Sequence, residues 1–142
     1  MLIRPATASD SLAITDILRN QPEYPHNNSL LHLKPLPHRL VLVALLETRV
    51  IGFIVVHWFF PITAPCEGFI ADLFVHQNFT ALGAGSALLE AVILEARAKG
   101  CSRLALNNWR DKISFHRGFY AKHGFVEKPL SARFVLQFEG LV

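Results

Sequence analysis

A glycine-containing turn between a predicted strand and a predicted helix is the part of the sequence best suited to hold phosphate. The strand covers residues 69–75, a polar stretch covers 76–82, and Gly-Ala-Gly at 83–85 opens a helix predicted for 86–99. The first N–H groups of a helix point at such a ligand, and the helix dipole adds partial positive charge. The spacing alone is equally typical of a tight turn with small residues for packing.

The residues after the turn support the helix. Apolar residues recur at helical spacing: Leu88, Ala91, Leu94 and Ala98. Glu95 and Lys99 form an i,i+4 pair, and Gly100 is a natural stop. The N-terminus of this helix therefore lies at the turn.

Composition indicates one folded domain over residues 1–142. Hydrophobic residues make up 51% and charged residues 18% of the chain, which excludes disorder. No run of eighteen apolar residues is present, and the first ten residues lack the apolar stretch of a signal peptide. We expect Cys66 and Cys101 to be buried thiols in or beside strands rather than a disulfide framework. We therefore expect a cytoplasmic protein without membrane association.

The charge pattern favours a small anionic ligand over nucleic acid. The net charge is +3, the pI is near 9.1, and the basic residues are scattered without interleaved aromatic residues. The seven His residues show no spacing with Cys or carboxylates that is typical of a metal site. We expect neither a metal nor a nucleic-acid partner.

Hydrophobic periodicity predicts a mixed α/β fold. The expected strands are 2–6, 40–46, 50–60, 66–75, 102–107, 125–128 and 133–138, and the expected helices are 9–20, 86–99 and 113–123. Leu12, Ala13, Ile14, Ile17 and Leu18 form the apolar stripe of the first helix. The early strands are antiparallel, and a crossover from 69 through 107 places two strands in parallel. One sheet with helices on both faces follows.

This order of elements and several short motifs resemble the GNAT acyltransferase superfamily. The motifs are IRPAT, RVIGFIVV, IADLFV followed by GAGSALL, and GFYAKHGF, spread from Ile3 to Phe138. IRPATASD, DLFV and a Trp shortly before the FY element look like the diamine and polyamine N-acetyltransferase branch. The resemblance implies a largely antiparallel sheet with a central, splayed pair of parallel strands.

The resemblance also implies acetyl-CoA as co-substrate. Its pantetheine arm would bond to the strand end, its pyrophosphate would lie on the N–H groups of residues 81–86, and Asn107 and Arg110 would contribute further contacts. The implied cofactor-binding residues are Leu73, Phe74, Val75, Thr80, Ala81, Leu82, Gly83, Ala84, Gly85, Ser86, Asn107 and Arg110.

Direct attack of a neutral amine on the thioester is the implied chemistry. The backbone N–H near Leu73 would stabilise the oxyanion. Tyr120, in the FY element, would protonate the departing thiolate, since a phenol has a pKa of about 10. A tyrosine that anchors a helix to the core is the alternative interpretation of Tyr120.

Two departures from the family pattern change the expected site. Thr80 and Ala81 stand where the family has Arg or Gln and then Gly, so we expect weaker or differently held CoA. Ala71 replaces a Glu, which leaves the base open among Glu67, Asp72, His57, His26 and water. Glu67 shares the face of Ala71 by alternation, and Asp72 points the other way unless a bulge intervenes.

The insertion before Tyr120 is a further departure. Arg110 stands where the family has Asn, Asn107 and Asn108 are nearby alternatives, and about three extra residues around 116–118 lengthen the helix or put a turn in it.

We expect an N-acetyltransferase that acts on a primary amine of a small molecule or peptide in a ternary complex. An acyl-CoA-binding module without turnover and a structural domain are the alternatives. A homodimer is implied by the resemblance. The proline-rich segment 21–39 has one acid, Glu23, against Lys34, Arg39 and three His, which argues against a polycationic acceptor.

Overall fold

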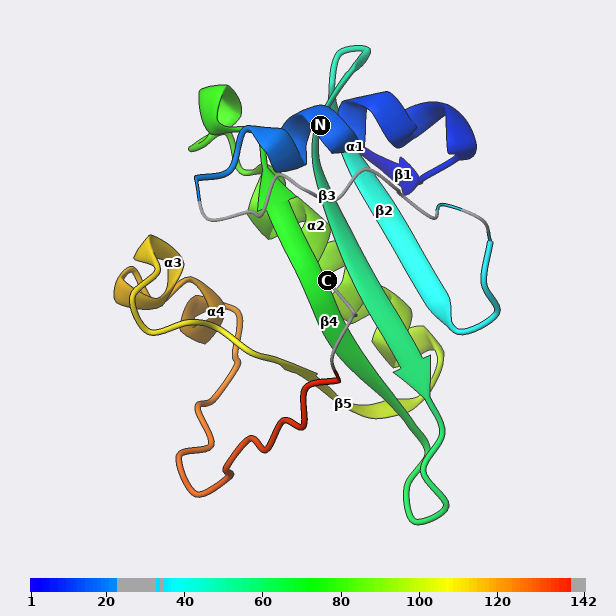
Figure 1. Ribbon diagram of the computed structural model, residues 1–142. Coiled ribbons are helices and arrows are strands. Elements are labelled where there is room, and N and C mark those ends of the chain that lie inside the picture. The colour runs from blue at the N-terminus through cyan, green and yellow to red at the C-terminus, as the bar shows by residue number, and fades with distance from the viewer. Residues whose placement is uncertain (23–32, 34, 139–142) are drawn as a thin grey trace. The chain divides into compact units, whose positions relative to one another are not determined.

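The computed structural model describes residues 1–22, 33 and 35–138 (Figure 1). The chain divides into two compact units, Met1–Asn107 and Asn108–Val142, and each is described by itself. That the whole chain behaves as one domain stays a prediction. Among the described residues, none of the helices has the length and apolar character needed to cross a membrane.

The first unit is built on a five-stranded sheet in the order β1-β2-β3-β4-β5. The strands are β1 (Leu2–Pro5), β2 (Arg39–Leu46), β3 (Arg49–Phe59), β4 (Cys66–Val75) and β5 (Cys101–Leu106). Neighbouring strands are antiparallel except β4 and β5, which are parallel. The predicted fold class and the first five predicted strands are confirmed, with bounds shifted by one residue at most.

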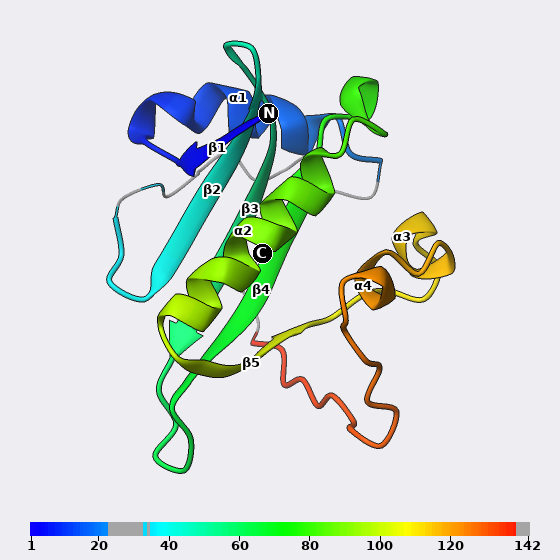
Figure 2. The same ribbon diagram turned by 180° about the vertical axis from the view of Figure 1, so that it is seen from behind.

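Helices cover both faces of this sheet. Figures 1 and 2 show α1 (Ser11–Arg19) on one face and α2 (Ala84–Ala98) on the other. On the α1 face, Ile14 and Ile17 pack against Val43 and Phe53 of the sheet. On the α2 face, Leu88 lies against Gly52, where a Cβ would be 3.3 Å from the leucine side chain. Residues 53 and 52 of β3 therefore point to opposite faces, as strand alternation requires.

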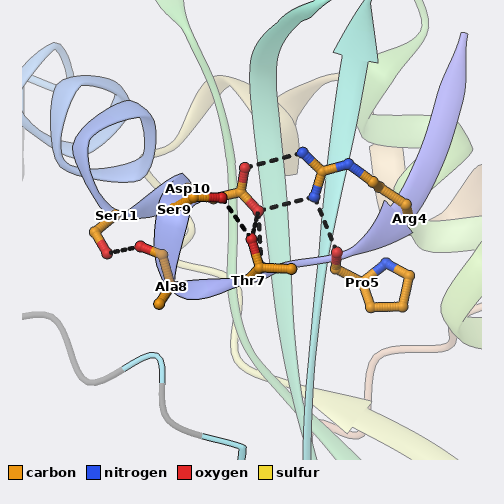
Figure 3. Close-up of polar contacts among 7 residues, drawn as sticks. All are labelled: Arg4, Pro5, Thr7, Ala8, Ser9, Asp10 and Ser11. Atoms are coloured by element: carbon orange, nitrogen blue, oxygen red, sulfur yellow. Dashed lines mark hydrogen bonds and ion pairs between the residues drawn. The ribbon is translucent and has the colours of Figure 1, made fainter.

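The start of α1 is fixed to β1 by an ion pair (Figure 3). Arg4 donates from Nη1 and Nη2 to the two carboxylate oxygens of Asp10, at 2.8 and 2.9 Å, and Thr7 N–H donates to Asp10 Oδ2 at 2.8 Å. Asp10 ends the short 3₁₀ helix η1 (Ala8–Asp10). The hydrogen bond from Arg4 is the main cause that lowers the pKa of the Asp10 carboxyl. One predicted member of the α1 stripe is wrong, since Leu12 is 85% exposed.

The two cysteines form a disulfide, so the expectation of buried thiols is wrong. Cys66 and Cys101 each begin a strand, and they are the first residue pair of the parallel β4–β5 register, with Cα atoms 4.0 Å apart. A crossover returns the chain to the same end of the sheet, so the starts of two adjacent parallel strands meet. The two cysteines are 35 positions apart, so no local sequence pattern indicates that they pair.

The second unit differs from its prediction in two places. The helix predicted for 113–123 is two short helices, α3 (Ile113–His116) and α4 (Phe119–Lys122). Between them Gly118 has a φ of +64°, a left-handed conformation that suits glycine, so the alternative of a turn around 116–118 is confirmed.

The strands predicted for 125–128 and 133–138 are wrong, because residues 125–138 contain no helix or strand. Phe134 is 91% exposed, and Leu136 and Phe138 are also exposed. Alternating apolar residues supply the pattern of a strand, but a strand also needs a partner whose backbone completes its hydrogen bonds.

Candidate functional site

The two parallel strands part beside the predicted cofactor site. Pairing of β4 with β5 runs from Cys66↔Cys101 to Ile70↔Leu106, whereas pairing of β4 with β3 continues to Val75. Both views show β5 leaving β4 (Figures 1 and 2). Residues 71–75 of β4 are thus bound to the sheet along one edge, and the predicted splay is confirmed.

Backbone direction shows which groups face the side that β5 has left. His76 N–H donates to Ile51 C=O at 2.8 Å, on the β3 side. Successive residues in a strand point their backbone groups to opposite edges, so the N–H and C=O groups of Leu73 and Val75 point away from β3. These are two of the three residues that the sequence assigns to the pantetheine arm; Phe74 instead turns its backbone groups toward β3.

A bulge in β4 settles the orientation of the candidate carboxylates. Val56 pairs with Ile70 and Val55 pairs with Asp72, which leaves Ala71 as an extra residue. Because cross-strand partners share a face, Asp72 lies on the face of Val55. Glu67 pairs with Phe59 on that same face. The alternative with a bulge is confirmed, and Asp72 and Glu67 are on one face of the sheet, the face that α1 covers.

Glu67 already has a cationic partner. Arg103 Nε lies 3.0 Å from Glu67 Oε1, with Glu67 buried and Arg103 largely exposed. Asp72 is half-buried. Of the other two candidate bases, His57 is exposed on β3 opposite Phe69, and His26 lies outside the described residues.

The turn that follows β4 has the geometry of an anion site. After η2 (Gln77–Phe79), Thr80 is extended, Ala81 has a φ of +67° and Gly83 caps α2 with a φ of +84°. The first bond inside the helix runs from Ala87 N–H to Gly83 C=O at 3.0 Å, so the amides of Ala84 and Gly85 precede it. The predicted helix starts two residues earlier than expected, at Ala84.

The backbone conformation of Ala81 explains why the family pattern has glycine at this position. An L-residue with positive φ brings its Cβ close to the following carbonyl, at a cost of about 1–2 kcal/mol. The turn adopts this conformation although its residue is alanine. Thr80 is exposed and donates weakly to Gln77 C=O at 3.5 Å. The Arg49 guanidinium brings positive charge close to this turn. Its Cζ lies 4.6 Å from the centre of the ring of Phe79, the residue before Thr80.

The end of β4 is also held by a residue that follows α1 and that the sequence did not single out. Gln21 Nε2 donates to Val75 C=O at 2.9 Å and to Ile17 C=O at 3.1 Å. Gln21 lies just beyond the predicted helix, where a polar residue is expected to face solvent. Its role is visible only from the contact with Val75, 54 positions away in the sequence.

Tyr120 belongs to the second unit, on α4. Its ring packs edge-on against Phe119 and Phe125, with centroids 5.0 and 5.9 Å away. Burial raises the pKa of the Tyr120 phenol above its ordinary value of 10. The hydroxyl is therefore protonated at neutral pH.

Two of the three other candidate polar residues, Arg110 and Asn108, have partners within the second unit. Arg110 forms an ion pair with Glu127 and lies over the Phe115 ring. Asn108 Oδ1 accepts a hydrogen bond from Ser114 at 3.1 Å. Asn107, the last residue of the first unit, is exposed directly after β5.

A family model identifies the class of this protein. The model of the acetyltransferase (GNAT) family matches residues 11–125, which is well over half of the chain. The chain belongs to this family and is an acetyltransferase by that membership. A search of curated proteins gave no match.

Solved structures agree with this fold. An acetyltransferase from Trypanosoma brucei is 22% identical, with 95% of this chain and 99% of that one covered and a TM-score of 0.72. A ribosomal-protein-alanine N-acetyltransferase from Brucella melitensis biovar Abortus 2308 is 20% identical, with 96% and 98% covered and a TM-score of 0.74. A transcriptional regulator from Bacillus halodurans C-125 is 19% identical, with 96% and 99% covered and a TM-score of 0.80. At these identities the likeness concerns the fold.

Proposed function

We propose that this protein transfers an acetyl group from acetyl-CoA to a primary amine of a small molecule or peptide. The observation that carries the proposal is the parting of β4 from β5, followed by a turn that leads into the N-terminus of α2. Leu73 and Val75 would bond to the pantetheine arm, and the amides of residues 81–86 would bind the pyrophosphate. The fit is chemical: the backbone amides at a helix N-terminus suit an anion, and an open strand edge suits an amide-containing chain.

Tyr120 is the proposed acid in this reaction. The amine attacks the thioester carbonyl and loses a proton, and the departing thiolate takes one. Acetyl-CoA supplies the activated acyl group. A phenol is protonated at neutral pH because its pKa lies well above 7, and burial raises the pKa of Tyr120 further, so this hydroxyl can supply the thiolate's proton.

We propose that Glu67 and Asp72 act on the amine side. The bulge turns both carboxylates to one face, and Asp72 adjoins Leu73, the proposed oxyanion donor. Because Asp72 is next to Leu73 in the chain, it is the stronger candidate for accepting the amine proton, directly or through water. Replacement of Asp72 by Asn should remove the acidic limb of the pH–rate profile, while Glu67→Gln should leave it in place.

The acceptor, the assembly and the location are parts of the same proposal. The sequence resembles the diamine and polyamine branch, and one structural neighbour is named as a ribosomal-protein-alanine N-acetyltransferase. Both names describe amine acceptors. We also propose a homodimer in the cytoplasm. The Cys66–Cys101 disulfide weighs against the cytoplasm, because disulfides are rare in the reducing cytosol. Mass spectrometry of protein alkylated inside cells tests the location: a reduced pair would support the cytoplasm, and an oxidised pair would contradict it.

A thiol-release assay tests the proposal. The purified protein is mixed with acetyl-CoA and a panel of diamines, amino acids, aminoglycosides and peptides with free N-termini. Amine-dependent release of CoA thiol is the expected result. Binding of acetyl-CoA without release across the panel would favour an acyl-CoA-binding module, and absence of any binding would refute both.

A further inference from the structure

We propose that Gln21 is a positioning residue that fixes the end of β4 against which the pantetheine arm binds; this rests on the proposed function. The Gln21 side chain is buried, with the residue 6% exposed. Its amide nitrogen uses both protons, on Val75 C=O and Ile17 C=O, and its oxygen accepts from Gln77 Nε2 at 3.1 Å. A buried amide with all three bonds made is held in one orientation.

The Val75 carbonyl is the significant partner. The peptide after Val75 is trans, so its C=O points opposite to its N–H, which belongs to His76. That N–H donates to Ile51 of β3. The carbonyl therefore points to the edge that β5 has left, where an added extended chain would seek an acceptor.

Gln21 thus determines how far along the edge of β4 the pantetheine arm can continue a ladder of backbone hydrogen bonds. With the Val75 carbonyl bonded to Gln21, the edge offers the N–H and C=O of Leu73 and the N–H of Val75. A carbonyl has two lone pairs and Gln21 occupies one of those on Val75, so the Leu73 carbonyl is the better acceptor and favours one register of the pantetheine arm relative to the proposed oxyanion donor. Specificity for that register comes from an amide that lies outside the glycine turn.

Two other residues, Asp16 of α1 and Asn20 directly after it, bond to the residues that follow β4 and not to this edge. Asn20 Oδ1 accepts from Gln77 N–H at 2.6 Å, and Asp16 Oδ2 lies 3.4 Å from His76 Nε2. These contacts hold His76 and Gln77, the two residues that follow β4. Asn20 is therefore a matched control: it lies next to Gln21 and bonds to the same Gln77, but it has no bond to the Val75 carbonyl.

Calorimetry with acetyl-CoA on purified full-length protein tests the proposal. Gln21→Ala and Gln21→Met should weaken acetyl-CoA binding about three- to tenfold, because part of the binding free energy would then go to ordering the end of β4, at a cost comparable to one net hydrogen bond. The KM for acetyl-CoA should rise in parallel and kcat should fall, because the thioester would no longer be held at the oxyanion donor, while the KM for the amine stays within about twofold of wild type. Asn20→Ala should lower the melting temperature comparably and leave acetyl-CoA affinity within about twofold.

The outcomes separate this inference from the proposed function. If the wild type does not bind acetyl-CoA, the proposed function fails and the role of Gln21 falls with it. If the wild type binds and the Gln21 variants bind equally well or better, only the role of Gln21 is refuted. Equal losses in Gln21 and Asn20 variants would show a general structural effect and would also refute it.

A measurement on the wild type removes the dependence on folded variants. Acetyl-CoA should shift the NMR signals of the Gln21 side-chain amide protons and slow their exchange with solvent. Unchanged signals at saturating acetyl-CoA would overturn the proposal.

Discussion

The two ends of β4 are built in opposite ways. At its start, β4 is paired on both edges and joined to β5 by the Cys66–Cys101 disulfide. At its end, residues 71–75 keep only the β3 partner, and a bulge at Ala71 marks the change. A strand that binds a ligand along its edge must leave hydrogen-bonding groups unused by the sheet, and the paired end compensates for that loss. The closed end should govern stability and the open end ligand binding.

Removal of the proposed acid should give the largest effect. Tyr120→Phe should lower kcat about 100-fold or more, because general acid catalysis contributes about 10²–10⁴-fold. Acetyl-CoA affinity should stay near wild type. Steady-state kinetics with the best amine of the panel checks this.

Phe125→Leu is the matched control, since Phe125 packs on the Tyr120 ring. That variant should be less stable and retain most of its kcat. Full activity of folded Tyr120→Phe would make Tyr120 a structural anchor instead.

Opening the disulfide should cost the most stability. The bond closes a loop across 35 positions, for which chain entropy predicts about 4 kcal/mol. Urea unfolding of Cys66→Ser with Cys101→Ser, against the oxidised wild type, measures the difference. Reductant should lower the wild type toward the double variant and leave the double variant unchanged.

If oxidised and reduced proteins unfold at the same urea concentration, the closed end is not what secures β4. The contrast between the two ends would then lose its energetic basis.

Restoring the cation of the family pattern at position 80 should strengthen acetyl-CoA binding at the open end of β4. Thr80→Arg should raise acetyl-CoA affinity about tenfold, since a hydrogen bond to a charged group contributes about 1.5–3 kcal/mol. Calorimetry measures it, with Thr80→Gln as the uncharged control. A Thr80→Arg protein that binds more weakly would mean that the pyrophosphate lies elsewhere.

Restoring the family glycine should change stability rather than affinity. Ala81→Gly should stabilise the protein by about 1 kcal/mol or less, because relief of the positive φ exceeds the entropy that glycine loses on folding. Leu82→Gly is the control, since Leu82 has no positive φ and should gain nothing. Thermal unfolding compares them. A destabilised Ala81→Gly would contradict the strain at this position.

A pH-dependent contact outside both ends gives the smallest effect. Folding lowers the pKa of Asp10, so its contact with Arg4 stabilises above the unfolded carboxyl pKa of about 4 and is lost as the pH falls through the lower folded value. Asp10→Asn should therefore lower the melting temperature at pH 7 more than at pH 3. An equal loss at both pH values would assign the effect to packing.

Local patterns predicted most of the first unit and little of the second. Apolar runs predicted the five strands of the sheet, and the small residues of 83–85 predicted the turn, because those signals are local in sequence. The Cys66–Cys101 bond and the Gln21–Val75 contact join residues 35 and 54 positions apart, so periodicity carries no trace of them. Residues 133–138 have the alternation of a strand, yet pairing depends on a partner that the pattern does not specify.

Amide hydrogen exchange with and without acetyl-CoA tests the central claim most directly. Saturating acetyl-CoA should slow exchange at the N–H groups of Leu73 and Val75 and in the turn 81–86, and should leave residues 66–70 unchanged. Unaltered exchange at Leu73 and Val75 in a protein that binds acetyl-CoA would contradict the account, because the cofactor would then not lie along the open edge of β4.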